Sequence, residues 1–150
     1  MRASPSSSTI EPLAALAGEL RISLGKLNRR LREQAQSGDF TSSQRSVFLR
    51  LERDGPATVS ALARAEGVKP QSMRITVALL EAQGAVVGEA DPHDGRKTVF
   101  TLTPAFKRTL KASRSAREDW LFHALQTQLT SDEHTTLSAA VKLLQRLADY

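Results

Sequence analysis

The sequence of 150 residues contains no cysteine. Disulfides, thiolate metal sites, thiol nucleophiles and thiol-based redox sensing are therefore excluded, and the absence fits a reducing compartment. No apolar run approaches the roughly 18 residues that cross a bilayer, and no apolar signal segment follows Arg2. We expect a soluble cytoplasmic protein with no membrane contact.

The motifs of common enzyme classes are missing too. The three histidines, His93, His123 and His134, do not have the spacing of metal ligands. Glu118 and Asp119 are neighbours on a predicted helix, so their carboxylates would diverge. There is no phosphate-binding loop, dinucleotide fingerprint or nucleophile elbow. We therefore expect no enzyme, no metal and no cofactor.

Basic residues exceed acidic ones by 21 to 16, which gives a net charge of +5. This balance permits a polyanionic partner, but no segment forms a basic tail, so charge alone identifies none. The length suits one domain, or one domain with appended helices.

Both ends of the chain carry helix signals. Residues 1–9 are rich in serine and are expected to be a disordered tail. A stripe of leucines at steps of three and four then predicts an amphipathic helix that needs a partner surface: Leu13, Leu16, Leu20, Leu24, Leu27 and Leu31. The last predicted helix carries a similar stripe of Leu137, Val141, Leu144 and Leu147.

The middle of the chain predicts a helix-turn-helix. Residues 41–44 have the form of a capping box that opens one helix, and Thr58 caps a second, short one that ends at Gly67. Pro70 suits the first position of a third helix, which closes at Gly84. A short helix, a three-residue turn and a longer helix are the layout of a helix-turn-helix.

The third helix has two distinct faces. Met73, Val77 and Leu80 form the predicted buried stripe. The opposite face carries four candidates for reading DNA: Gln71, Ser72, Arg74 and Ile75. In a major groove, glutamine pairs with adenine, arginine with guanine, a hydroxyl with bases or phosphate, and an apolar side chain with the thymine methyl group. The alternative is an ordinary solvated helix face.

Two predicted strands, residues 85–91 and 97–103, follow and flank a turn at Asp94 and Gly95. Such a hairpin would carry Arg96 to the phosphates or into a narrow minor groove, with Asp94 orienting its guanidinium. His93 and Lys97 complete the candidate set at this wing. A plain turn with a solvated Arg96 is the alternative, and His93 either contacts phosphate or is solvated.

These residues resemble the MarR family of bacterial transcription regulators. The resemblance covers about residues 11–150 and is most specific over 69–103. The wing reads DPHDGRKTVFTLT, and the helix before it reads PQSMRITVALLEAQGAVV. Many members have an arginine where this sequence has Ile75, and Arg74 is the arginine that this helix offers.

The resemblance implies a mainly α fold with a small β wing. Residues 38–103 would form the winged helix-turn-helix lobe, and residues 10–37 and 104–150 the N- and C-terminal dimerisation helices. The residues expected at the dimer contact are Leu13, Leu16, Leu20, Leu137, Val141 and Leu144. Arg96 would sit in the minor groove, held by Asp94.

The same resemblance implies a homodimeric repressor on a pseudo-palindromic site in double-stranded DNA. Members often respond to small lipophilic anions, which would make a small molecule the effector, although no residue is assigned to its site. The competing hypothesis is a winged-helix adaptor that binds proteins and not DNA. Steep loss of DNA affinity with added salt favours the regulator.

Overall fold

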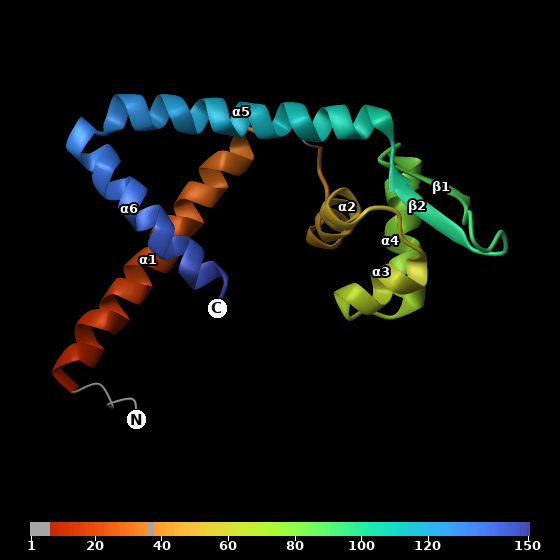
Figure 1. Cartoon of the computed structure of the whole chain (residues 1–150), viewed down its shortest axis with the longest axis horizontal. Coiled ribbons are helices and arrows are strands. Elements are labelled where there is room, and N and C mark those ends of the chain that lie inside the picture. Colours follow the sequence, from red (N-terminus) through yellow and green to blue (C-terminus); the bar gives the residue numbers. More distant parts are fainter. Residues whose placement is uncertain (1–6, 36–37) are drawn as a thin grey trace. The chain divides into compact units, whose positions relative to one another are not determined.

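The computed structural model describes residues 7–35 and 38–150, with side chains from Glu11 onward. Within these ranges the elements are α1 (Ser7–Glu33), α2 (Ser42–Asp54), α3 (Val59–Glu66), α4 (Pro70–Ala82), β1 (Val86–Ala90), β2 (Thr98–Leu102), α5 (Pro104–Gln128) and α6 (Ser131–Ala148) (Figure 1). They form two compact units. One is a lobe over residues 38–113, and the other combines residues 7–35 with 114–150.

The helices of the lobe begin and end where their capping residues predict. The Thr41 hydroxyl accepts the N–H of Gln44, and the Gln44 side chain accepts the N–H of Thr41 at 2.8 Å. Thr58 caps α3 through the N–H of Ala61 at 3.1 Å. Gly67 ends that helix with φ of 65°, a left-handed conformation that glycine adopts without a steric penalty. Local chemistry thus fixes the short turn between α3 and α4.

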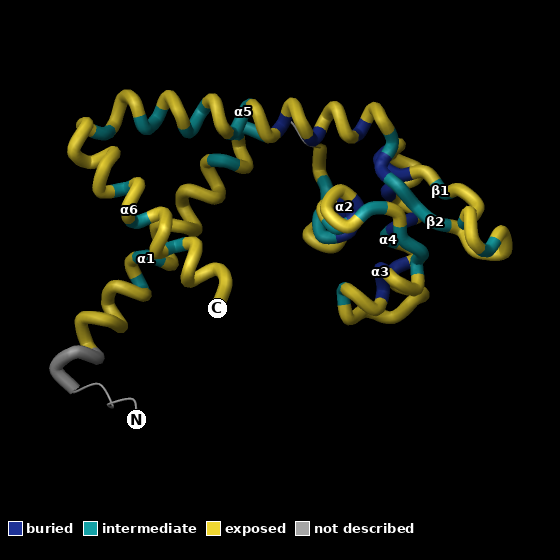
Figure 2. Tube along the Cα trace, in the orientation of Figure 1, coloured by how far each residue is buried: buried dark blue, intermediate teal, exposed yellow. Residues whose placement is uncertain are grey.

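One hydrophobic core holds the lobe together. Each helix contributes its predicted inward face, and the strands and α5 close the core, which comprises Val47, Phe48, Leu51, Leu62, Ala63, Met73, Val77, Leu80, Ala85, Val86, Leu102, Phe106 and Leu110. Phe40, Phe48 and Phe106 add three edge-to-face ring contacts at 5.1–5.4 Å. Figure 2 shows the buried residues gathered in this lobe.

The wing is a two-stranded antiparallel sheet, in register from Val86 opposite Leu102 to Ala90 opposite Thr98. Gly88 is required there, because a Cβ atom would come within 2.9 Å of the Phe100 ring. A single bridge that the sequence did not predict adds Ala57: its N–H donates to Phe100 at 3.1 Å, and its carbonyl accepts at 2.8 Å. The bridge ties the loop before α3 to the wing.

Two predicted boundaries need correction. Helix α1 begins at Ser7, inside the tail predicted for residues 1–9, because serine and threonine cost a growing helix only a few tenths of a kcal/mol per residue. Residues 1–6 lie outside the described ranges. The lobe also reaches past Thr103 to Ser113, because Phe106 and Leu110 of α5 are buried in its core.

The second unit has no buried core of its own. In the described parts of α1 and α6, no side chain is buried. Leu13 is 61% exposed and Leu16 58% exposed on α1, and Val141 and Leu147 are exposed on α6. Figure 2 shows α1 and α6 as exposed or intermediate along their described lengths, whereas the lobe contains buried residues. Within the described residues, no helix is both long and apolar enough to cross a membrane.

Candidate nucleic-acid interface

Helix α4 presents the predicted polar face to solvent. Its buried side holds Met73, Val77 and Leu80, none more than 3% exposed, and so fixes the rotation of the helix. Gln71, Ser72, Arg74 and Ile75 are all exposed. Ile75 is 57% exposed although it is apolar. The four candidates thus share a solvent-facing surface of one rigidly packed helix.

The wing ends in the loop predicted between its strands, but the turn at its tip is of another type than the tight turn expected at Asp94 and Gly95. A tight turn at Asp94 and Gly95 would need positive φ at the glycine, yet Gly95 does not have it. The loop spans residues 92–96, as predicted, and its turn runs from Asp94 to Lys97, where the N–H of Lys97 donates to the Asp94 carbonyl at 2.9 Å. Two aspartate side chains shape it: Asp91 accepts the N–H of His93 at 2.8 Å, and Asp94 that of Arg96 at 3.2 Å.

Asp94 also orients the basic side chains of the wing. Its Oδ1 accepts a hydrogen bond from Nε of Arg96 at 3.2 Å. Its Oδ2 forms an ion pair with Nζ of Lys97 at 3.8 Å. The Arg96 side chain is 93% exposed, against 30% for Asp94. The carboxylate therefore faces inward between two cations while the guanidinium projects outward. His93 is exposed on the same loop.

A crevice of about 620 Å³ lies between the start of α3 and the wing, with Arg74 of α4 in its lining. It is lined by Thr58, Val59, Ser60, Ala61, Arg64, Arg74, Asp91, Lys97, Thr98 and Phe100. The structure thus brings Arg74 of α4 and Lys97 of the wing together with Arg64 of α3. Arg64 was not among the predicted site residues, because nothing in the sequence pattern of α3 distinguishes it from a solvated arginine.

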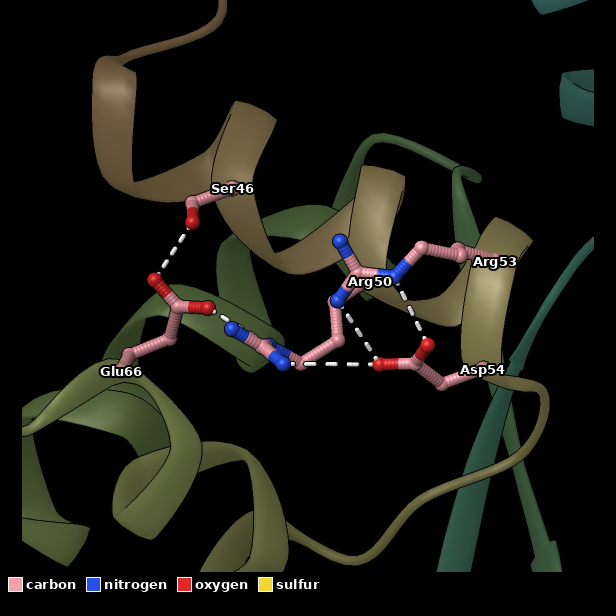
Figure 3. Close-up of polar contacts among 5 residues, drawn as sticks. All are labelled: Ser46, Arg50, Arg53, Asp54 and Glu66. Atoms are coloured by element: carbon pink, nitrogen blue, oxygen red, sulfur yellow. Dashed lines mark hydrogen bonds and ion pairs between the residues drawn. The ribbon is translucent and has the colours of Figure 1, made fainter. Parts of the chain in front are cut away.

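A second polar cluster, also missed, fixes α3 to α2 (Figure 3). The Glu66 carboxylate accepts hydrogen bonds from the Ser46 hydroxyl and from Nε of Arg50, the latter at 2.7 Å. Arg50 and Arg53 both contact Asp54, at 3.4 and 2.8 Å. Glu66 is the last residue of α3, directly before Gly67, so this cluster anchors the helix-turn-helix at its turn.

The cluster makes stability depend on pH. Hydrogen bonds from Ser46, and then from Arg50, hold the pKa of Glu66 below its ordinary value of 4.5. A carboxylate with a lowered folded-state pKa stabilises the fold fully above the unfolded-state pKa, and this stabilisation is lost as the pH falls through the lower, folded-state value.

Replacing Glu66 with glutamine is therefore expected to lower the free energy of unfolding at neutral pH by about 1.5–3 kcal/mol, the usual range for a hydrogen bond to a charged group. Urea titrations of both proteins at neutral pH and at a series of pH values below 4.5 would measure this difference in the free energy of unfolding. The two proteins should converge in acid, whereas an exposed control, Glu89→Gln, should follow the wild type. A constant difference at every pH would contradict this role.

These features define a winged helix-turn-helix protein with an exposed polar recognition-type helix and a basic wing. The MarR family profile matches residues 39–97. An uncharacterized HTH-type transcriptional regulator of Mycobacterium leprae is 35% identical over 136 residues, which cover 91% of this chain and 94% of the relative. The chain therefore belongs to the MarR family of transcriptional regulators.

Solved structures agree with this assignment. A Pseudomonas aeruginosa chain described as a transcriptional regulator is 34% identical, with a TM-score of 0.80 over 97% of this chain and 99% of that one. A mutant of MepR from S. aureus, solved bound to an oligodeoxyribonucleotide, shares the fold at 19% identity, with a TM-score of 0.66 over 88% of this chain and 97% of that one.

Family membership confirms the prediction that this protein is a regulator and not an enzyme. It also confirms the winged helix-turn-helix fold. In the described part of the chain, no group of three or more His, Asp or Glu side chains could hold a metal ion.

Proposed function

We propose that the protein is a sequence-specific, homodimeric repressor that reads a pseudo-palindromic site in double-stranded DNA. One observation carries the proposal: an exposed polar face on α4 lies beside a wing whose Arg96 is 93% exposed and oriented by Asp94. Gln71, Ser72, Arg74 and Ile75 would contact base edges, and Arg96, Lys97 and His93 would contact the flanking backbone or minor groove. The bacterial cytoplasm, where the chromosome lies, is the proposed location.

The exposed apolar stripes support a homodimer. Leu13 and Leu16 on α1 and Val141 on α6 are exposed, and Leu20, Leu137 and Leu144 are only partly buried. Apolar side chains left open to solvent along a helix favour an association site. A two-fold dimer would place its two α4 helices one helical turn of DNA apart. Release by a small lipophilic anion is proposed on the family resemblance alone.

The test is selection of bound DNA from a random pool, followed by salt titration of the enriched site. A pseudo-palindromic motif with half-sites about ten base pairs apart is expected, together with affinity that falls steeply with salt. No enrichment from the random pool would instead favour the adaptor hypothesis.

On that site, Arg96→Ala is expected to weaken binding to all DNA, most where the flanks are rich in A and T, because a narrow minor groove has the strongest negative potential. The slope of log affinity against log salt should fall by about 1 for each protomer, and so by about 2 for the homodimer. Arg96→Lys, which keeps the charge, is the matched control. Unchanged affinity of Arg96→Ala for an A/T-flanked site would remove the wing from the interface.

A further inference from the structure

The crevice between α3, α4 and the wing gathers charge from three elements. Arg64, Arg74 and Lys97 line it, and the carboxylate in its lining, Asp91, accepts a hydrogen bond from the backbone of His93. Among residues 7–35 and 38–150, no ion pair joins Arg64 or Arg74 to a carboxylate. Both guanidinium groups are therefore available to an external anion.

The geometry of DNA places a backbone over this crevice. One sugar-phosphate strand separates a major groove from the adjacent minor groove. If α4 lies in the major groove and the wing reaches the next minor groove, that strand has to pass between α4 and the wing. The crevice opens between the start of α3 and the wing, next to Arg74 of α4, so the phosphates of this strand would face Arg64 and Lys97.

We propose that Arg64 binds a phosphate of this dividing strand, so that α3 makes a DNA contact of its own. The inference rests on the proposed function, because it assumes that α4 and the wing engage adjacent grooves. A guanidinium suits phosphate, since it donates two parallel hydrogen bonds. Phosphate contacts set affinity and register but carry no base information. Arg64 would therefore strengthen binding to every sequence equally.

The experiment compares Arg64→Gln with the wild type on the selected site and on unrelated DNA. Arg64 is exposed and forms no ion pair within the described residues, so the variant should fold normally, which thermal unfolding would verify. The homodimer carries two copies of Arg64, so the slope of log affinity against log salt should fall by about 1.8, and a fourfold rise in salt should weaken the wild type about 12-fold more than the variant. Arg64→Lys should retain most of the slope.

A matched control is Lys142→Gln, which removes the same charge from α6, outside the lobe, and should leave the slope unchanged. Identical slopes for the wild type and Arg64→Gln would overturn the inference and leave the proposed function intact. A loss confined to particular base sequences would overturn the phosphate assignment. A wild type that binds no DNA would remove the proposed function, and this inference with it.

Discussion

Glutamate in place of Leu16 is expected to convert the protein into a monomer and to lower its affinity for the operator by about 10²–10⁴-fold. The loss is large because a dimer binds its second half-site as an intramolecular event, and a monomer forfeits that gain. Sedimentation at micromolar protein would measure the oligomeric state, and titration of the selected site would measure the affinity.

The dimer should dissociate because burial of Leu16 at the interface supplies part of the free energy of dimerisation. Leu16 is 58% exposed in the single chain, so the substitution disturbs no intrachain core. In a dimer, a buried leucine contributes about 1.5–3 kcal/mol. Because of the two-fold symmetry, each substitution removes this contribution from both protomers. A carboxylate placed there also has to be desolvated without a partner. The protomer should therefore keep its fold while the interface fails.

The matched control is Ala15→Glu, which adds the same charge to α1. Ala15 is exposed and lies one residue before Leu16, so helical spacing turns it away from the leucine stripe. This variant should remain dimeric and bind with wild-type affinity. A Leu16→Glu protein that stays dimeric would place the interface elsewhere, and a folded wild-type monomer would remove the homodimer altogether.

The lobe could be predicted from its sequence because its signals are local. Thr41 and Gln44 cap α2 from three residues apart, and Gly67 and Pro70 set the turn between α3 and α4. The bridge from Ala57 to Phe100 has no such signal. It joins two residues distant in sequence, neither of which belongs to a pattern that would reveal the other.

The same distinction separates the predicted interface residues from the missed ones. Arg96 and Asp94 could be paired because they are two residues apart on one loop. Glu66 reaches Ser46 and Arg50 across 20 and 16 residues of sequence, so only the packed lobe reveals the contact. The wing loop was predicted at the right place, but its turn type was not, because backbone N–H groups bound to aspartate side chains replace the left-handed glycine of a two-residue turn.

Alanine in place of Arg74 is expected to relax base preference at one position in each half-site, at a cost of roughly 1–3 kcal/mol for the preferred base. Arg74 extends from the exposed face of α4, whose buried side fixes its direction. An arginine that donates two hydrogen bonds to guanine loses that discrimination when it is shortened. Selection from a random pool with wild type and variant in parallel would show the change in the motif.

Arg74 and Arg64 line the same crevice, and this makes them a matched pair. Arg74→Ala and Arg64→Gln each remove one positive charge per protomer. Only the substitution of a residue that reads a base edge should alter the selected motif. If Arg74→Ala weakened all sequences equally and left the motif unchanged, both arginines would be phosphate contacts. Base recognition would then pass to the remaining exposed side chains of α4, Gln71, Ser72 and Ile75. Gln71→Ala would be the next variant to carry through the same selection.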